Sequence, residues 1–217
     1  MTASEFSALL VLATATSFTP GPNTTLSTAL AANGGLPRAL RFIAAVPVGW
    51  GILFTLCAAG VGSLVVAVPA LRWAILLGGT GYLLWLARRL WGSRSLTTVD
   101  SARLNVTFWQ GVGLQFLNIK AWMLALSIVA GWIAGQTDAA QRYMLVLPVL
   151  LAFAFFSNLS YALVGSLLRH WLAGPVVNGQ PSGARLLVFN RGMALALVLT
   201  AAWMLLGGAG LSFGGAA

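Results

Sequence analysis

Six long runs of apolar residues fill most of this chain, and each is close to the length that a helix needs to cross a lipid bilayer. A crossing takes about 20 residues at a rise of about 1.5 Å per residue. Only 7% of the 217 residues are charged, whereas a soluble domain carries roughly 25%. We therefore predict an all-α membrane protein with six transmembrane helices, at residues 6–32, 42–68, 71–87, 108–135, 143–168 and 186–211.

The basic residues fall mainly between these runs, and they give the chain a formal net charge of +9. Cytoplasmic loops of membrane proteins carry an excess of arginine and lysine. Nine arginines follow the first, third and fifth runs, against two on the other side: Arg38, Arg41, Arg88, Arg89, Arg94, Arg103, Arg169, Arg185 and Arg191 against Arg72 and Arg142. We expect those three loops in the cytoplasm, facing anionic lipid headgroups, and both termini outside. This distribution argues against a nucleic-acid partner.

A basic loop at residues 89–107 divides the chain into halves at 1–88 and 108–217, with three predicted helices in each. Because three is an odd number, two equivalent halves would lie in opposite orientations. This is the inverted-repeat architecture of many secondary transporters. We accordingly predict two inverted three-helix repeats. Glycine-rich helix faces would also permit a homodimer.

The first run is interrupted near its middle by Thr19-Pro20-Gly21-Pro22-Asn23. Proline has no N–H and crowds the preceding turn, so carbonyls just before it lose their helical partners. In lipid such groups must find partners within protein or a water-filled cavity. A simple proline kink is the ordinary alternative. Two prolines around a glycine exceed what a kink needs, so we predict a discontinuous helix that binds substrate through Pro20, Gly21, Pro22 and Asn23.

The fourth and fifth runs carry further polar residues at depth. Asn118 and Lys120 interrupt the fourth run, and a lysine near the bilayer centre costs about 2.5–3.5 kcal/mol on insertion scales. Lys120 should therefore face the bundle interior, where it can attract a carboxylate. Ser157, Asn158 and Tyr161 form a patch in the fifth run that either lines a path or joins helices. Gly49, Trp50, Gly51 and Thr55 in the second run are weaker candidates.

The sequence offers no chemistry of its own at these positions. It has no metal-ligand cluster, no nucleophile–base set and no Walker motif, and no carboxylate is predicted within the membrane. We therefore predict no enzyme, no catalytic residues, no metal and no cofactor.

At the polar interruptions the chain resembles the lysine exporter superfamily, the LysE/RhtB-type amino-acid translocators. Three motifs carry the resemblance, which covers essentially the whole chain: Pro20-Gly21-Pro22-Asn23, then Gly78-Gly79-Thr80-Gly81-Tyr82-Leu83 followed by Leu86-Ala87, and Asn118-Ile119-Lys120-Ala121. In the third motif Ile119 stands where the family commonly has proline. We therefore expect the fourth helix to be less broken than in relatives.

The resemblance implies a secondary transporter that exports amino acids or related small metabolites across the bacterial inner membrane, driven by the proton motive force. Because no intramembrane carboxylate would balance a second positive charge, we expect a neutral amino acid. Its carboxylate would lie near Lys120 and its ammonium near the freed carbonyls of the first helix. The alternatives are a passive small-solute channel and a non-transporting membrane scaffold.

Overall fold

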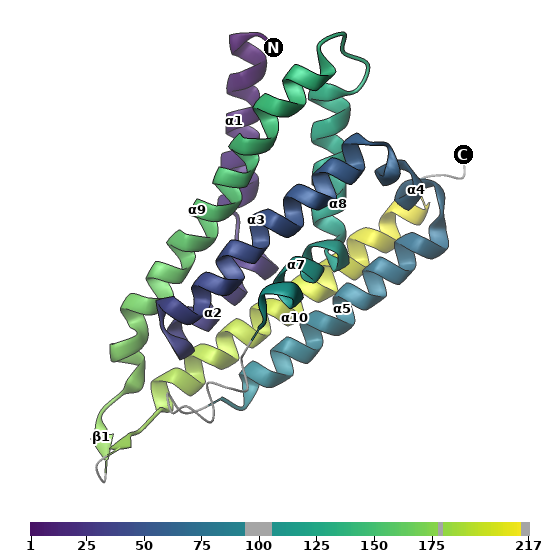
Figure 1. Cartoon of the computed structure of the whole chain (residues 1–217). Helices are drawn as coiled ribbons and strands as arrows, with labels where there is room; N and C mark the ends of the chain where they lie inside the picture. Colours follow the sequence, from purple (N-terminus) through teal and green to yellow (C-terminus); the bar gives the residue numbers. More distant parts are fainter. Residues whose placement is uncertain (94–105, 178–179, 214–217) are drawn as a thin grey trace.

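Helices make up nearly all of the described structure, a computed structural model that covers residues 1–93, 106–177 and 180–213 (Figure 1). The helices are α1 (Ala3–Phe18), α2 (Pro22–Gly34), α3 (Leu36–Ala58), α4 (Val61–Ala67), α5 (Pro69–Trp91), α7 (Phe108–Leu117), α8 (Ile119–Ile128), the π-helix η1 (Val129–Ile133), α9 (Ala139–Ala173) and α10 (Ala184–Phe213). Between α9 and α10, strand β1 (Val176–Val177) pairs antiparallel with β2 (Gln180–Pro181).

The prediction of an α-helical membrane protein is confirmed, although six spans are not. Four helices are long and apolar enough to cross a membrane: α3, α5, α9 and residues 184–206 of α10. If α7 and residues 119–133, which are bent relative to each other, count together as one span, the number of candidate spans rises to five. The predicted first span is two helices, and α1, with 16 residues, rises only about 24 Å at 1.5 Å per residue. That is less than the bilayer's hydrocarbon core of about 30 Å.

The predicted second span, 42–68, has wrong boundaries at both ends. Helix α3 begins at Leu36, because Gly35 takes φ +81° and Pro37 fits the first turn of a helix. It ends at Ala58, and Gly60, at φ +91°, separates it from the short α4. Glycine is the residue that tolerates such backbone angles. The predicted span 42–68 did not anticipate the break at Gly60.

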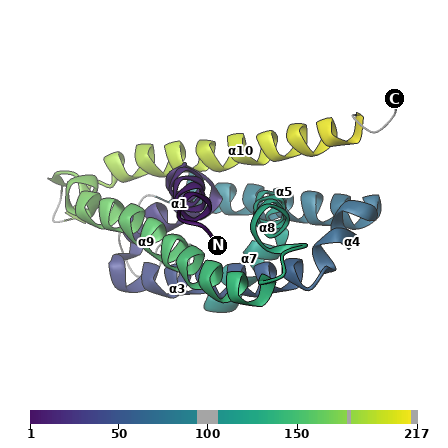
Figure 2. The same cartoon turned by 90° about the horizontal axis from the view of Figure 1, so that it is seen from above.

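Close helix packing gathers the bundle around α2, α3 and α9 on one side and α5 with α10 on the other (Figure 2). Helices α5 and α10 run side by side and antiparallel (Figure 1). Glycine permits the closest approaches. A Cβ on Gly165 of α9 would lie 2.3 Å from the carbonyl oxygen of Thr28 in α2, and one on Gly79 of α5 would lie 1.9 Å from that of Leu117 in α7. These positions exclude any side chain.

The two ends of the bundle differ in charge. The ends of α2 and α5 and the start of α10 meet in a buried network, where Asn33 and Asn190 exchange hydrogen bonds of 2.7 and 2.8 Å and the Asn190 amide also donates to the Ser93 carbonyl. The arginines predicted for the cytoplasmic loops lie in the adjoining helix ends: Arg38 and Arg41 in α3, Arg88 and Arg89 in α5, Arg169 in α9, and Arg185 and Arg191 in α10. Arg94 and Arg103 lie outside the described residues.

At the opposite end, the starts of α1 and α9 lie together at the top of Figure 1. There Arg142 bonds Asp138 at 2.7 Å and Glu5 at 3.2 Å, and the chain's amino group lies 3.4 Å from Asp138. Every acidic side chain that the structure describes belongs to this cluster, which is remote from the helix breaks.

Candidate transport site

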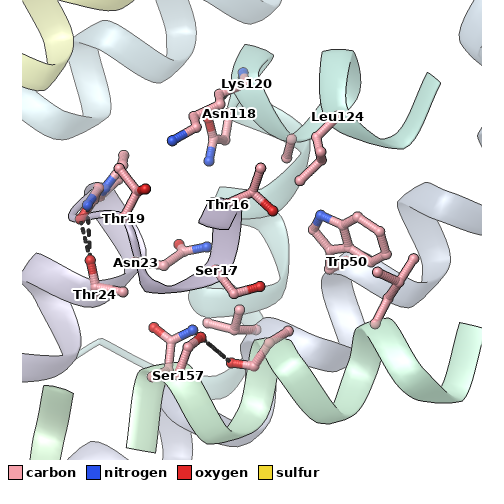
Figure 3. Close-up of a pocket in the computed structure, with 17 residues that line it drawn as sticks. Thr16, Ser17, Thr19, Asn23, Thr24, Trp50, Asn118, Lys120, Leu124 and Ser157 are labelled. Carbon is pink, nitrogen blue, oxygen red and sulfur yellow. Dashed lines mark hydrogen bonds between the residues drawn. The ribbon is translucent and has the colours of Figure 1, made fainter. Parts of the chain in front are cut away.

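A cavity lies where the two interrupted helices approach each other inside the bundle (Figure 3). Its volume is about 100 Å³, less than the roughly 300–1,000 Å³ of typical small-molecule sites. Residues from α1 and α2, from α3, from α8 and from α9 line it: Thr16, Ser17, Thr19, Gly21, Pro22, Asn23, Thr24, Val46, Trp50, Asn118, Lys120, Ala121, Leu124, Leu150, Ala154, Ser157 and Asn158. The cavity is therefore small and has polar groups on several sides.

The first break separates α1 from α2 at Thr19–Gly21, as the Pro-Gly-Pro sequence predicts. Pro22 occupies the first turn of α2, and the Thr24 hydroxyl accepts from the Gly21 N–H at 2.9 Å. The N-terminus of α2 thus begins beside the cavity. Unpaired N–H groups at a helix N-terminus carry a partial positive charge, equivalent to about half an elementary charge.

The second break lies at Asn118, where α7 and α8 are bent by 70° relative to each other. The Asn118 side chain caps α8 by accepting from the Lys120 N–H at 3.2 Å. The fourth predicted helix is therefore broken, although Ile119 stands where the family commonly has proline. Asparagine is a strong N-cap, and α5 approaches the end of α7 closely here, since a Cβ on Gly79 would lie 1.9 Å from the Leu117 carbonyl oxygen. A second helix N-terminus consequently points into the same region.

A pair of amides joins the two broken helices. The Asn23 Nδ2 donates to Gln115 Oε1 at 2.9 Å, and the Gln115 Nε2 donates to Asn23 Oδ1 at 3.2 Å. Gln115 is fully buried in α7 and was not among the predicted residues. Its signal in the sequence is a polar amide inside an apolar run, one turn before Asn118. Because Asn23 also lines the cavity, this pair fixes one wall of the site.

Lys120 is half-buried, and its ammonium lies 5.9 Å from the centre of the Trp203 ring on α10. No carboxylate is among the residues that line the cavity, and Lys120 has no acidic partner within the described residues. A cation and two helix N-termini therefore meet around one cavity without a counter-ion. Such a site favours an anionic group.

The remaining predicted residues divide into two groups. Ser157 and Asn158 line the cavity, and Asn158 also holds α9 to α2 by accepting from the Ser27 hydroxyl at 2.9 Å. Pro20 and Tyr161 lie outside the lining. The Tyr161 hydroxyl donates to the carbonyl oxygen of Phe18 at 2.8 Å. Tyr161 therefore satisfies a carbonyl that the first break frees, which is a supporting role.

No metal site accompanies the cavity: the described residues contain no group of three or more histidine, cysteine, aspartate or glutamate side chains that could hold an ion. A polar cavity between interrupted helices, inside an otherwise apolar bundle, is the arrangement typical of secondary transporters.

Sequence comparisons give the family. Residues 14–195 match the model of the LysE type translocators, and the chain belongs to this family. The resemblance found in the motifs is thus confirmed, and the family is one of translocators rather than enzymes. Together with the apolar helices, membership makes the chain a multi-pass inner-membrane protein.

Curated relatives extend over most of the chain. A cysteine/O-acetylserine efflux protein of Klebsiella pneumoniae is 34% identical over 171 residues, which cover 78% of this chain and 86% of the relative. Proteins of the same description from Salmonella typhimurium and Escherichia coli K12 are 31% and 30% identical, again covering 78% of this chain and 86% of each relative. No solved structure gave a significant match.

Proposed function

We propose that this protein is a secondary transporter that exports neutral amino acids across the bacterial inner membrane. One observation carries the proposal: the N-termini of α2 and α8 and the ammonium-bearing Lys120 border one cavity that contains no carboxylate. An amino acid enters such a site with its α-carboxylate toward these positive groups. Efflux of amino acids by the curated relatives supports this reading.

The ammonium group of the substrate faces the end of α1. There Thr16, Ser17 and Thr19 line the cavity, and the backbone leaves the helix after Phe18. Hydroxyls and carbonyls that have lost helical partners accept hydrogen bonds from an ammonium group. A second positive charge on the substrate finds no carboxylate in the lining, so neutral substrates are favoured over lysine or arginine. Cysteine and O-acetylserine, named for the relatives, are neutral amino acids.

Several further features belong to the same proposal. The halves 1–88 and 108–217 act as inverted repeats, each contributing one interrupted helix to the cavity. The arginine-rich end faces the cytoplasm and its anionic headgroups, and the termini face outward. The proton motive force drives export, and two copies can associate as a homodimer. The predicted linker, 89–107, falls largely outside the described residues.

The test is transport by purified protein in proteoliposomes, with Lys120→Met and Lys120→Arg as a matched pair. Wild type should show saturable counterflow of a labelled neutral amino acid, with trans-stimulation that a passive channel does not show. Lys120→Met should abolish it, and Lys120→Arg should retain part of it because the charge remains. Equal transport by wild type and Lys120→Met would overturn the proposal, while loss of trans-stimulation in wild type would favour a channel.

A further inference from the structure

We infer that Trp50 selects the side chain of the substrate, by limiting its size and by offering its indole N–H to a hydrogen-bond acceptor. This inference rests on the proposed amino-acid transport and concerns a different part of the substrate. The α-carboxylate and ammonium are assigned to groups on the interrupted helices. Trp50 belongs to α3, which is not interrupted at the cavity.

Trp50 forms a separate wall of the cavity. Figure 3 shows Asn118 and Lys120 at one edge of the site, Ser157 at the opposite edge, and the Trp50 indole at the side. The indole is 8% exposed, and it lines the cavity. A substrate held by its carboxylate and ammonium at the helix breaks therefore has its side chain available to contact this ring.

The indole is held in place by a stack of aromatic rings. Trp50 stacks on Phe54 with ring centres 5.1 Å apart, and Phe54 stacks on Tyr143 of α9 at 6.0 Å. The Tyr143 hydroxyl lies 2.7 Å from that of Thr55, within hydrogen-bond distance. Phe54 is fully buried. Because the ring behind Trp50 has no free space, the indole cannot move back to admit a larger side chain.

The glycines on both sides of Trp50 fix the backbone of α3 as well. A Cβ on Gly49 would lie 2.6 Å from the carbonyl oxygen of Val112 in α7, and a Cβ on Gly51 would lie 3.2 Å from the Leu151 side chain of α9. Helix α3 is thus in direct contact with two neighbours at the level of the tryptophan. Gly49-Trp50-Gly51 therefore presents a rigid wall.

The indole N–H of Trp50 has no hydrogen-bond partner within the described part of the chain. Its nitrogen is not among the buried, unpaired atoms, and Figure 3 shows it turned toward Thr16 and Ser17 across the cavity. The indole N–H is a donor only. A substrate whose side chain carries a hydroxyl or thiol satisfies it, whereas a purely apolar side chain leaves it without a partner.

Size and polarity together define the substrate class. A cavity of about 100 Å³ with a rigid wall on one side favours a short side chain over branched or aromatic ones. The free donor favours side chains with an acceptor over alkyl side chains of equal length. The structure therefore assigns to this site neutral amino acids with a short, acceptor-bearing side chain, and it assigns the discrimination to Trp50.

Two substitutions separate the two roles. In proteoliposomes, counterflow of labelled serine is competed with unlabelled serine, alanine, leucine and phenylalanine. Trp50→Ala removes the wall, so competition by leucine and phenylalanine should rise at least about tenfold relative to serine. Trp50→Phe keeps an aromatic ring on the stack but removes the N–H together with part of the indole's volume. It should relax the size limit less than Trp50→Ala does, and it should reduce the preference for serine over alanine by about tenfold. Trp109→Ala, at a 73% exposed residue outside the cavity, is the control and should change neither ratio.

An unchanged serine-to-leucine ratio in a transporting Trp50→Ala protein would overturn the size limit. If that variant does not reconstitute, Trp50→Phe decides: an unchanged serine-to-alanine ratio would overturn the donor role. Wild type that transports no amino acid overturns the proposed function itself. That outcome is distinguishable because it is seen before any substitution is made.

Discussion

The contact between α5 and the end of α7 gives the sharpest test of how the second helix break is held. Gly79 lies against the carbonyl oxygen of Leu117, the residue before Asn118. We predict that Gly79→Ala destabilises the protein and lowers transport, whereas Gly81→Ala, two residues along the same helix, does neither. Nothing lies within 4 Å of a Cβ at Gly81, and that position is exposed.

The magnitude follows from the geometry. Ordinary contact begins at about 3.4 Å and the added Cβ would lie 1.9 Å from the oxygen, so the two helices must separate by the difference, about 1.5 Å. Both contacting groups are attached directly to backbone, so no rotamer change relieves the clash. Overpacking of this kind typically costs about 1–3 kcal/mol. Both variants gain about 1 kcal/mol of helix propensity, so their difference isolates the clash.

The assay is thermal unfolding of both variants in the same detergent, followed by transport at a temperature where both remain folded. For a chain of this length about 1 kcal/mol corresponds to roughly 2–4 °C in Tm. Gly79→Ala should therefore unfold about 2–12 °C below Gly81→Ala. Transport should fall in Gly79→Ala alone, because the displaced Leu117 moves Asn118 at the cavity. Equal unfolding temperatures in the two variants would refute the reasoning.

Three other predictions concern the supports of the site. Asn23→Ala and Gln115→Leu should show coupling of about 0.5–3 kcal/mol in a double-mutant cycle of detergent unfolding, because each leaves the same amide pair broken; additive effects would contradict the pairing. Tyr161→Phe should lower unfolding temperature while leaving substrate selectivity unchanged, and altered selectivity would place Tyr161 in the site. Arg142 donates to Asp138 and lowers the pKa of that carboxyl. The contribution of this ion pair to stability should be fully present above the ordinary aspartate pKa of about 3.9. It should be lost as the pH falls through the lowered pKa of Asp138. Wild type and Asp138→Asn should then differ in unfolding temperature at neutral pH and converge in acid, and a constant difference would argue against this pair.

The first helix break could be predicted from the sequence because its cause is local. Pro20 and Pro22 lack the N–H groups that a continuous helix requires, whatever surrounds them. The second break combines a local cap with a contact from a distant helix. Asn118 supplies a cap, but the close approach of Gly79 comes from α5, far away in the sequence. Reasoning from Ile119 alone gave no measure of this bend, which is 70°.

The composition of the site was only partly predictable, for the same reason. Asn23, Asn118 and Lys120 were identified because polar residues are conspicuous in apolar runs. Gln115 gains its meaning from a partner 92 residues away, and sequence spacing does not reveal such a pair. Tyr161 was predicted to line a path or to join helices, and only the structure shows that its hydroxyl reaches the backbone of α1.

Recognition of the substrate carboxylate by the cavity between the two breaks is the central claim, and competition by a carboxamide measures it most directly. In proteoliposomes containing wild-type protein, counterflow of labelled serine is challenged with unlabelled serine or with serinamide, which keeps the ammonium and side chain and lacks the negative charge. Serine should compete fully, and serinamide should compete at least about tenfold less well, since one charge-assisted contact contributes about 1.5–3 kcal/mol. Equal competition by the two compounds would show that Lys120 and the helix N-termini do not hold the carboxylate.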